Sequence, residues 1–422
     1  MTINSQTFEK VVPRLSRRNF LLAIAGAGVT TALTTYGYNA LFDIGSETRP
    51  ETEQLVPFLG LHQAGILTPT PASALMVAFD TTANNKNELI QTFKVLTERI
   101  KFLMAGGTPP IIDPKFPPHD SGILGTKVYP DNLTITAAVG NSIFSDRYGL
   151  SQLRPKHLSE MPSFPNDELN PELCHGDLML QFCANHAETN LHALRDIIKN
   201  LASSLVVRWK IEGFQQPNTL KGKNRTSTRN MLGFKDGTAN LDTTDSKLME
   251  RNVWVKANTE EPSWATGGTY QVVRIVRNRV EFWDRTPLQE QEQIIGRKKD
   301  TGAPLGMQHE HDIPEYDRDP KGKKIRLDAH IRLANPRDSE QSLILRRGFN
   351  YSRGVDKAGQ LDMGLLFACF QQDLEKGFAT VQKRLNGEPL EEYIRPIGGG
   401  YFFVLPGVTN AGNYLGQTLL EA

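Results

Sequence analysis

NELIQTFKVLTERIKFLM, residues 87–104, decides how the first half of the chain is interpreted. Its apolar residues recur at helical spacing and predict an amphipathic helix: Leu89, Ile90, Phe93, Leu96, Ile100 and Leu103. Working outward, we expect a strand before it at 75–80 and a strand after it at 133–140. A strand at 177–184, a helix at 187–203 and a strand at 204–214 follow. The order strand–helix–strand–strand–helix–strand is the ferredoxin-like plan.

The second half repeats this order with one extra strand. Strands are expected at 269–283, 324–334, 342–351, 363–371 and 399–407, with helices at 286–296 and 373–387. Thr286 and Pro287 are typical of a helix start, and Gly296 is typical of a helix end. We therefore expect an α+β protein of two ferredoxin-like domains, similar to a dimeric α+β barrel, over residues 55–214 and 230–420. The polar stretch 213–230 would join them.

The N-terminal segment 1–40 has the composition of an export signal. Arg17 and Arg18 directly precede a run of small and apolar residues that carries no charge before Asp43. This pattern predicts a cleaved twin-arginine signal peptide and a periplasmic protein that is not an integral membrane protein when mature. An uncleaved membrane anchor is the alternative.

Composition excludes several other functions. The formal net charge is +1, with no basic patch, so the sequence gives no support for nucleic-acid binding. Three cysteines without C-x-x-C spacing argue against a disulfide framework or a zinc site.

Three short stretches hold residues that can do chemistry. MLGFKDGTANLD, residues 231–242, places Asp236 between Gly233 and Gly237, either as an ordinary turn or as an acid presented to a ligand. IRLDAHIRL, residues 325–333, places His330 on the polar face of an expected strand, either solvated or ligating. LILRRGFNY ends an apolar strand with Arg346 and Arg347, which are either surface groups or directed into a pocket.

A fourth stretch, GMQHEHDIPEYD at 306–317, contains His309, His311, Asp312 and Glu315. Two histidines at His-x-His spacing on a strand lie on one face and suit zinc or copper. A solvated loop at the rim of a pocket is the alternative.

The chain resembles the dye-decolourising peroxidases, a haem family, over nearly all of residues 55–420. The resemblance rests on GLHQAGI (60–66), GFKDGTAN (233–240), VVR…EFWDRTPLQEQEQIIGR with GAPL after it (272–305), DAHIR (328–332), ILRRGFNY (344–351) and GGGYFF (398–403). The set is specific, although no single motif in it is. With the twin-arginine pair, the chain looks similar to the periplasmic deferrochelatase/peroxidase branch associated with bacterial iron uptake.

This resemblance implies a set of residue roles. His330 matches the proximal ligand of haem iron, and Glu392, next to Glu391, matches a carboxylate that bonds to this histidine. Asp236 matches the distal acid. Arg346, or its neighbour Arg347, matches the distal arginine. Gly237 would let the backbone approach the haem, and Arg332 would meet a haem propionate.

The implied function is a haem peroxidase with one haem b per chain in the C-terminal domain. It would reduce hydrogen peroxide and oxidise organic donors or iron, with iron-uptake proteins as partners and a homodimer as its assembly. An aspartate that acts as a base near its reference pKa of about 4 predicts an activity optimum at about pH 4–5. A deferrochelatase that releases iron from intact porphyrin, or a non-catalytic haem or iron carrier, is the alternative.

Overall fold

The computed structural model describes residues 51–216, 227–337 and 342–422. The expected signal peptide at 1–40 lies outside these residues. In the described part of the chain, no helix is both long enough and apolar enough to cross a membrane.

The first half contains four strands and two long helices. In chain order they are β1 (Ser73–Thr81), α3 (Lys86–Ala105), β2 (Thr134–Gly140), β3 (Leu178–Ala184), α4 (Ala187–Asn200) and β4 (Leu205–Phe214). The predicted helix at 87–104 is confirmed. It begins where the Asn85 side chain accepts a hydrogen bond from the Glu88 amide, and it ends at Gly106, whose φ of 69° suits glycine.

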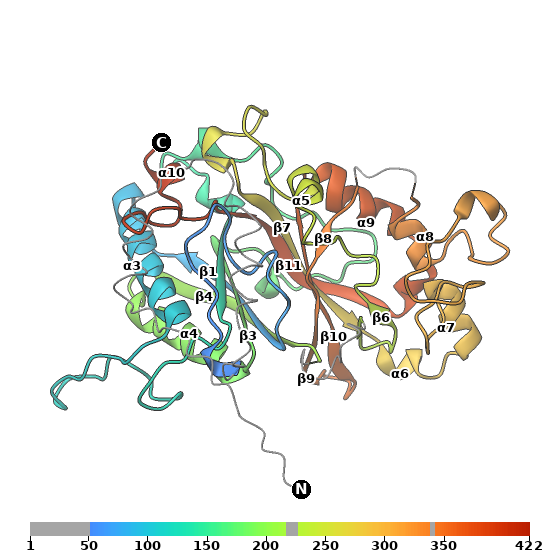
Figure 1. Ribbon diagram of the computed structural model, residues 1–422, viewed down its shortest axis with the longest axis horizontal. Helices are drawn as coiled ribbons and strands as arrows, with labels where there is room; N and C mark the ends of the chain where they lie inside the picture. Colours follow the sequence, from blue (N-terminus) through green and yellow to red (C-terminus); the bar gives the residue numbers. More distant parts are fainter. Residues whose placement is uncertain (1–50, 217–226, 338–341) are drawn as a thin grey trace, which may run out of the picture. The chain divides into compact units, whose positions relative to one another are not determined.

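The helices of the described second half are shorter than α3 and α4, and this half contains more elements. They are β5 (Thr228–Arg229), β6 (Lys235–Asp236), α5 (Ser246–Asn252), β7 (Thr269–Asn278), α6 (Val280–Trp283), α7 (Leu288–Ile295), α8 (His330–Ala334), β8 (Leu345–Arg346), β9 (Phe349–Val355), β10 (Leu361–Gln371), a π-helical turn (Glu375–Ala379), α9 (Thr380–Leu385), β11 (Ile394–Val404) and α10 (Gln417–Leu420). Figure 1 shows α3 and α4 beside the strands of the first half, and α8 and α9 beside those of the second.

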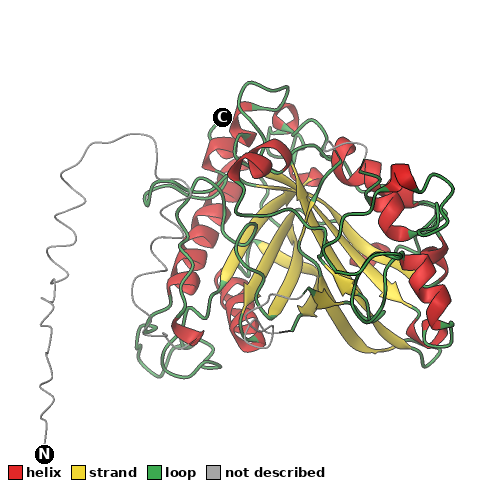
Figure 2. Ribbon diagram, turned by 45° about the vertical axis from the view of Figure 1, so that its right-hand side comes forward, coloured by secondary structure: helices red, strands yellow, loops and turns green. Residues whose placement is uncertain are grey.

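Strands of both halves form one sheet. Its order in the described chain is β7-β11-β2-β3-β1-β4-β9-β10-β8, and β10 also pairs with β7. Eight strands, four from each half, therefore form a closed antiparallel ring (Figure 2). The short strand β8 pairs with β10 and lies outside this ring. The expected α+β, barrel-like fold is confirmed.

Alternation along the strands separates two cores. On β1, Leu75, Val77 and Phe79 face a core that includes α3 and α4. Ala74, Met76 and Ala78 face a second core, which also receives residues from β7, β9, β10 and β11. Because residues of both halves fill this second core, neither half buries it alone.

Three sequence predictions in the second half are wrong. The strand expected at 269–283 ends at Asn278, and Val280–Trp283 form helix α6. Residues 324–334 form a turn and helix α8. The alternation of apolar and polar residues there does not reflect a sheet with one buried face, because Leu327 is 55% exposed and Arg326 bonds Asp328 within the turn. The strand expected at 342–351 is broken into β8 and β9. Without the strand at 324–334, four strands of this half remain in the ring.

Candidate active site

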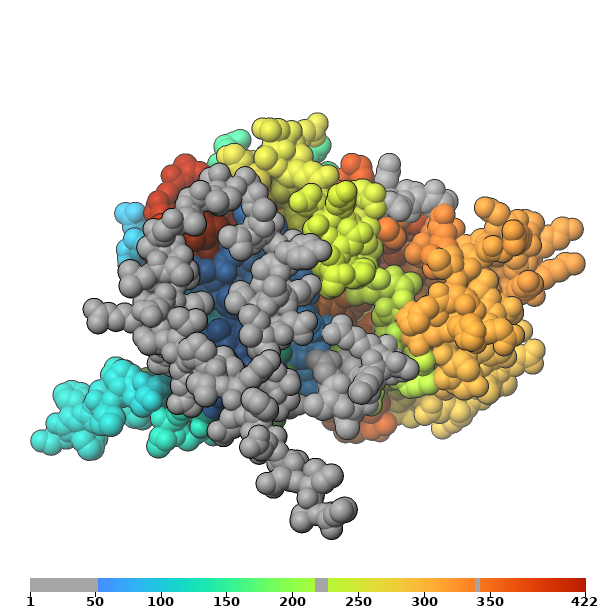
Figure 3. Space-filling view, viewed as in Figure 1, coloured from blue at the N-terminus to red at the C-terminus, as the bar shows by residue number. Residues whose placement is uncertain are grey.

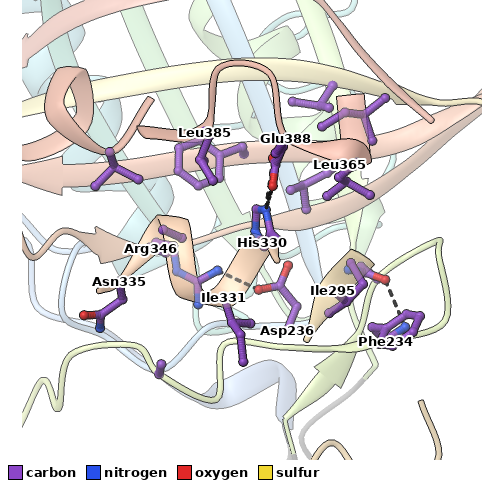
Figure 4. A pocket seen from close by; sticks show the side chains of 18 of the residues that line it. Phe234, Asp236, Ile295, His330, Ile331, Asn335, Arg346, Leu365, Leu385 and Glu388 are labelled. Atoms are coloured by element: carbon purple, nitrogen blue, oxygen red, sulfur yellow. Dashed lines mark hydrogen bonds and ion pairs between the residues drawn. The ribbon is translucent and has the colours of Figure 1, made fainter. Parts of the chain in front are cut away.

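A cavity of about 290 Å³ lies within the second half of the chain and includes Asn166 from the first half in its lining. Its walls are mostly apolar and include Leu232, Phe234, Ile295, Ile331, Ile344, Leu365, Phe367, Phe378, Val381, Leu385 and Leu390 (Figure 4). Four of the residues singled out from the sequence line it, namely Asp236, Gly237, His330 and Arg346. Arg332, Arg347 and Glu392 are not among its lining residues.

His330 is held by a buried carboxylate. Its Nδ1 lies 2.8 Å from Oε2 and 3.1 Å from Oε1 of Glu388, whose side chain is 2% exposed. An Nδ1–H that donates to this carboxylate leaves Nε2 unprotonated and directed away from Glu388. The prediction that Glu392 is this partner is therefore wrong.

The chain conformation explains why Glu388 holds this position. Gly387 has a φ of 82°, which glycine adopts readily, and Pro389 restricts Glu388 to an extended conformation with ψ of 149°. The turn after α9 therefore directs this carboxylate toward α8. A glycine and a proline on either side of a glutamate were the only sequence signal for it.

The same contact shifts the pKa of His330. Burial disfavours the imidazolium, but the charge and hydrogen bond of Glu388 outweigh burial and raise the pKa of His330 above its ordinary value. The carboxylate therefore makes this imidazole a stronger electron donor than a free histidine would be.

Asp236 and Arg346 form an ion pair on the other side of the imidazole. Nη1 of Arg346 donates to Oδ1 of Asp236 at 2.7 Å, and both side chains are about 30% exposed, at 31% and 27%. In Figure 4, Glu388 lies on one side of His330, and this pair lies on the other. Within the described chain, Oδ2 of Asp236 makes no hydrogen bond, so it is the atom available to a ligand.

A second ion pair fixes the strand that carries Asp236. Lys235 donates to Oε2 of Glu310 at 2.5 Å, and the Thr238 hydroxyl donates to Oε1 at 3.0 Å. Glu310 belongs to the long segment 297–323, whose orange surface adjoins the yellow-green surface of residues 227–245 in Figure 3. The histidines on either side of Glu310 carry the His-x-His pattern, whereas no motif in the sequence marks Glu310 itself.

Arg347 points away from the cavity. It is 4% exposed, and its Nη1 donates to the carbonyl of Thr68. Successive residues of an extended chain face opposite sides, so only one of Arg346 and Arg347 reaches the cavity. The structure identifies that residue as Arg346.

Arg332 is also engaged elsewhere. Its guanidinium donates to the carbonyls of Ile325 and Asp319, each at 3.0 Å, and it stacks on Tyr316. The prediction that Arg332 meets a propionate is not supported by this placement. Arg297 and Arg337 line the cavity instead. Arg297 is buried and its Nη1 donates to the carbonyls of Gly302 and Glu310, whereas Arg337 is exposed.

The histidines at 309 and 311 form no metal centre with their neighbours. Among the described residues, no group of three or more His, Cys, Asp or Glu side chains is placed to hold a metal ion. The carboxylate of Asp312 accepts hydrogen bonds from the amides of Gln308 and His309, as expected of a turn. The metal-site alternative is therefore not supported.

The arrangement fits haem. The imidazole of His330 is held in a fixed tautomer by a carboxylate, and the cavity walls are mostly apolar. Arginines in the lining suit the carboxylate groups of the haem propionates. An acid paired with an arginine faces the cavity from the other side. An imidazole held by a carboxylate, with an acid and a cation on its other side, fits the site of a haem peroxidase.

Comparison with known proteins gives the family. The chain matches the model for the C-terminal part of the Dyp-type peroxidases over residues 227–409 and the model for the N-terminal part over residues 63–215. The chain therefore belongs to the Dyp-type peroxidase family; it is an enzyme, and haem is its cofactor.

Among similar proteins are several called deferrochelatase. One, from Yersinia pestis, is 58% identical over 377 residues, which cover 89% of this chain and 87% of that protein. Another, from Shigella boydii, is 56% identical over 421 residues, which cover 98% and 99%.

Solved structures agree with the family. The DyP-type peroxidase from Cellulomonas bogoriensis is 35% identical, with a TM-score of 0.79 over 89% of this chain and 100% of that one. Ferric DtpA from Streptomyces lividans is 33% identical, with a TM-score of 0.80 and the same coverage.

Proposed function

We propose that this chain is a peroxidase that binds one haem b, reduces hydrogen peroxide, and oxidises organic donors or iron. One observation carries the proposal: Asp236 and Arg346 lie on the side of His330 that faces away from Glu388, and all four residues line a single, mostly apolar cavity. The two pairs have separate tasks, because His330 with Glu388 holds a cofactor and the other pair handles a substrate.

His330 would ligate haem iron through Nε2, with Glu388 fixing the tautomer through Nδ1. Of the arginines that line the cavity, the exposed Arg337 would pair with a propionate, and the buried Arg297 would add a second positive charge. Haem, when bound, supplies iron-centred redox chemistry. The apolar walls exclude water and strengthen the electrostatic interactions inside the cavity.

Asp236 would move the proton of the substrate. Its free Oδ2 accepts a proton from one oxygen of hydrogen peroxide and returns it to the other oxygen, which leaves as water. Arg346 stays protonated, so it stabilises negative charge on the leaving oxygen and does not act as a base. In the overall reaction, hydrogen peroxide takes two electrons from the donor and two protons and yields two waters.

The cellular setting belongs to the same proposal. Arg17 and Arg18 before an apolar run support twin-arginine export to the periplasm. The relatives named deferrochelatase support a link to iron uptake. Proteins of that system as partners and a homodimer as the assembly are part of the same proposal.

A second candidate is deferrochelatase activity, in which iron leaves and the porphyrin ring remains intact. It is favoured by the names of these relatives, which share more than half of this sequence. A non-catalytic carrier is less well supported, because a carrier has no use for Asp236 and Arg346 beside the imidazole.

The test begins with the purified protein loaded with hemin. Absorption titration to one equivalent and extraction of the pigment check the stoichiometry and haem type. Adding hydrogen peroxide then should change the haem spectrum, and Asp236→Asn should bind hemin equally but react far more slowly. Porphyrin fluorescence that appears without peroxide would favour the second candidate. Failure to bind hemin would overturn both.

A further inference from the structure

The side-chain amide of Asn240 bonds to both main-chain polar groups of Arg346. Its Nδ2 donates to the Arg346 carbonyl at 2.7 Å, and its Oδ1 accepts from the Arg346 amide at 2.8 Å. Both distances are those of good hydrogen bonds. One asparagine side chain therefore does for Arg346 what a neighbouring strand would do.

The sheet explains why Arg346 has these two groups free. Its strand, β8, has two residues and is the last in the sheet order. On one side β8 pairs with β10, where Arg346 lies opposite Cys369. On the other side it is an edge, and an edge residue keeps an unpaired N–H and C=O. Asn240 occupies that edge.

The Asn240–Arg346 contact connects the segment that carries Asp236 to the main chain of Arg346. Asn240 follows Asp236 by four residues in the GFKDGTAN stretch, and Arg346 returns to Asp236 through its guanidinium at 2.7 Å. Residues 233–240, called here the Asp236 loop, thus hold Arg346 at its main chain through Asn240 and at its guanidinium through Asp236. Glu310, through Lys235 and Thr238, holds the same loop from the other direction.

We propose that Asn240 is a positioning residue that fixes the main chain of Arg346, so that its guanidinium meets Asp236 in the cavity. The proposal rests on the proposed peroxidase function and adds a residue to it. Arg346 is long and about one-third exposed, so without a fixed main chain its guanidinium would sample many positions. A misplacement of about 1 Å can cost about 100-fold in rate.

Two substitutions separate the two hydrogen bonds. Asn240→Ala removes both, whereas Asn240→Asp keeps an acceptor for the Arg346 amide, loses the donor to its carbonyl and adds a negative charge. The matched control is Asn252→Ala. Asn252 is a buried asparagine whose Nδ2, like that of Asn240, donates to a main-chain carbonyl, but this carbonyl is that of Leu248 and not of Arg346.

The first readout is hydrogen exchange of the Arg346 amide in the purified protein, which needs no catalysis. We expect exchange to rise about fivefold or more in Asn240→Ala, and to stay near the wild-type rate in Asn240→Asp and Asn252→Ala. An unchanged rate in Asn240→Ala would overturn the proposal, because the amide would then be protected by another group.

The second readout is the rate constant for reaction of the haem-loaded protein with hydrogen peroxide. Asn240→Ala should lower it by about 10- to 100-fold with hemin affinity unchanged, since His330 and Glu388 lie on the other side. Asn252→Ala should lower the melting temperature without changing this rate constant. Faster exchange with an unchanged rate constant in Asn240→Ala would overturn the positioning role.

The two failures are distinguishable. A wild-type protein that binds hemin but does not react with peroxide would overturn the proposed function. The exchange comparison would still decide whether Asn240 holds Arg346.

Discussion

Arg274 and Asp167 form an ion pair that is almost wholly removed from solvent, with side chains 2% and 1% exposed. Nη1 of Arg274 donates to Oδ2 of Asp167 at 3.1 Å, and the guanidinium also stacks on Phe164. Arg274 lies on β7 and lines the cavity, whereas Asp167 comes from the first half of the chain. The pair therefore links the two halves beside the proposed haem site.

Breaking this pair should destabilise the protein strongly. Asp167→Asn leaves a buried guanidinium without its counter-charge, and we expect the free energy of unfolding to fall by about 3–5 kcal/mol. Urea denaturation measures the change. The control is Glu212→Gln, which removes a pair with Lys210 whose side chains are 58% and 47% exposed, and should cost less than about 1 kcal/mol. Equal losses in the two variants would contradict the burial argument.

The carboxylate behind His330 should control how tightly haem is held. Glu388→Gln keeps a hydrogen-bond acceptor but loses the charge, and we expect hemin affinity to fall by about 10- to 100-fold. Hemin transfer to a competing apoprotein measures it. Glu392→Gln is the matched control, because Glu392 lies four residues on and does not line the cavity. A larger effect in Glu392→Gln would restore the sequence-based assignment.

Asp236 and Arg346 should act on peroxide as a unit. Asp236→Asn and Arg346→Leu should each lower the rate of reaction with hydrogen peroxide by about 100- to 1,000-fold. The double variant should be little worse than either single variant, because paired groups are not additive. Stopped-flow absorbance gives the four rates. Fully additive losses would show that the ion pair at 2.7 Å has no catalytic consequence.

Acid should remove the stabilisation that Glu310 provides as the pH falls from about 4.5 toward 2. Burial opposes ionisation of Glu310, but its hydrogen bonds to Lys235, Ser227 and Thr238 outweigh burial and lower its pKa to about 2. A lowered pKa stabilises the fold fully above the unfolded value of about 4.5, and this contribution is lost as pH falls toward 2.

Glu310→Gln should therefore reduce stability at neutral pH and flatten its dependence on pH. Between about pH 5 and pH 2, the difference from wild type should shrink by up to about 3 kcal/mol. Thermal unfolding across that range measures it, with Glu212→Gln as an exposed comparison. A constant difference would mean that Glu310 titrates normally in the folded protein.

Much of the site was accessible from sequence, for identifiable reasons. Asp236 lies between two glycines, both with positive φ in the structure, at 84° for Gly233 and 95° for Gly237. Arg346 follows an apolar run beside Gly348. Both are local signals that a short motif can carry, and the structure brings both residues to the cavity.

The errors come from contacts between distant segments. The His330–Glu388 bond joins α8 to the turn after α9, and spacing within either segment does not specify the partner. Glu310 bonds a strand more than seventy residues earlier in the sequence. Apolar and polar residues alternate along 324–334, which is the pattern of a strand. A turn that leaves Leu327 exposed can show the same alternation, so the pattern alone did not distinguish the two.

The closed ring of strands constrains how the protein can fold while it is being synthesised. Phe402 of β11 lies opposite Gly140 of β2, and Phe214 of β4 lies opposite Asn350 of β9, so both seams join residues far apart in the chain. Until β11 has been synthesised, β2 lacks its partner and presents an open edge. Pairings of such long range are slow to form and expose unfinished sheets to aggregation. A nascent chain of this protein should therefore depend on chaperones until its final strand closes the ring.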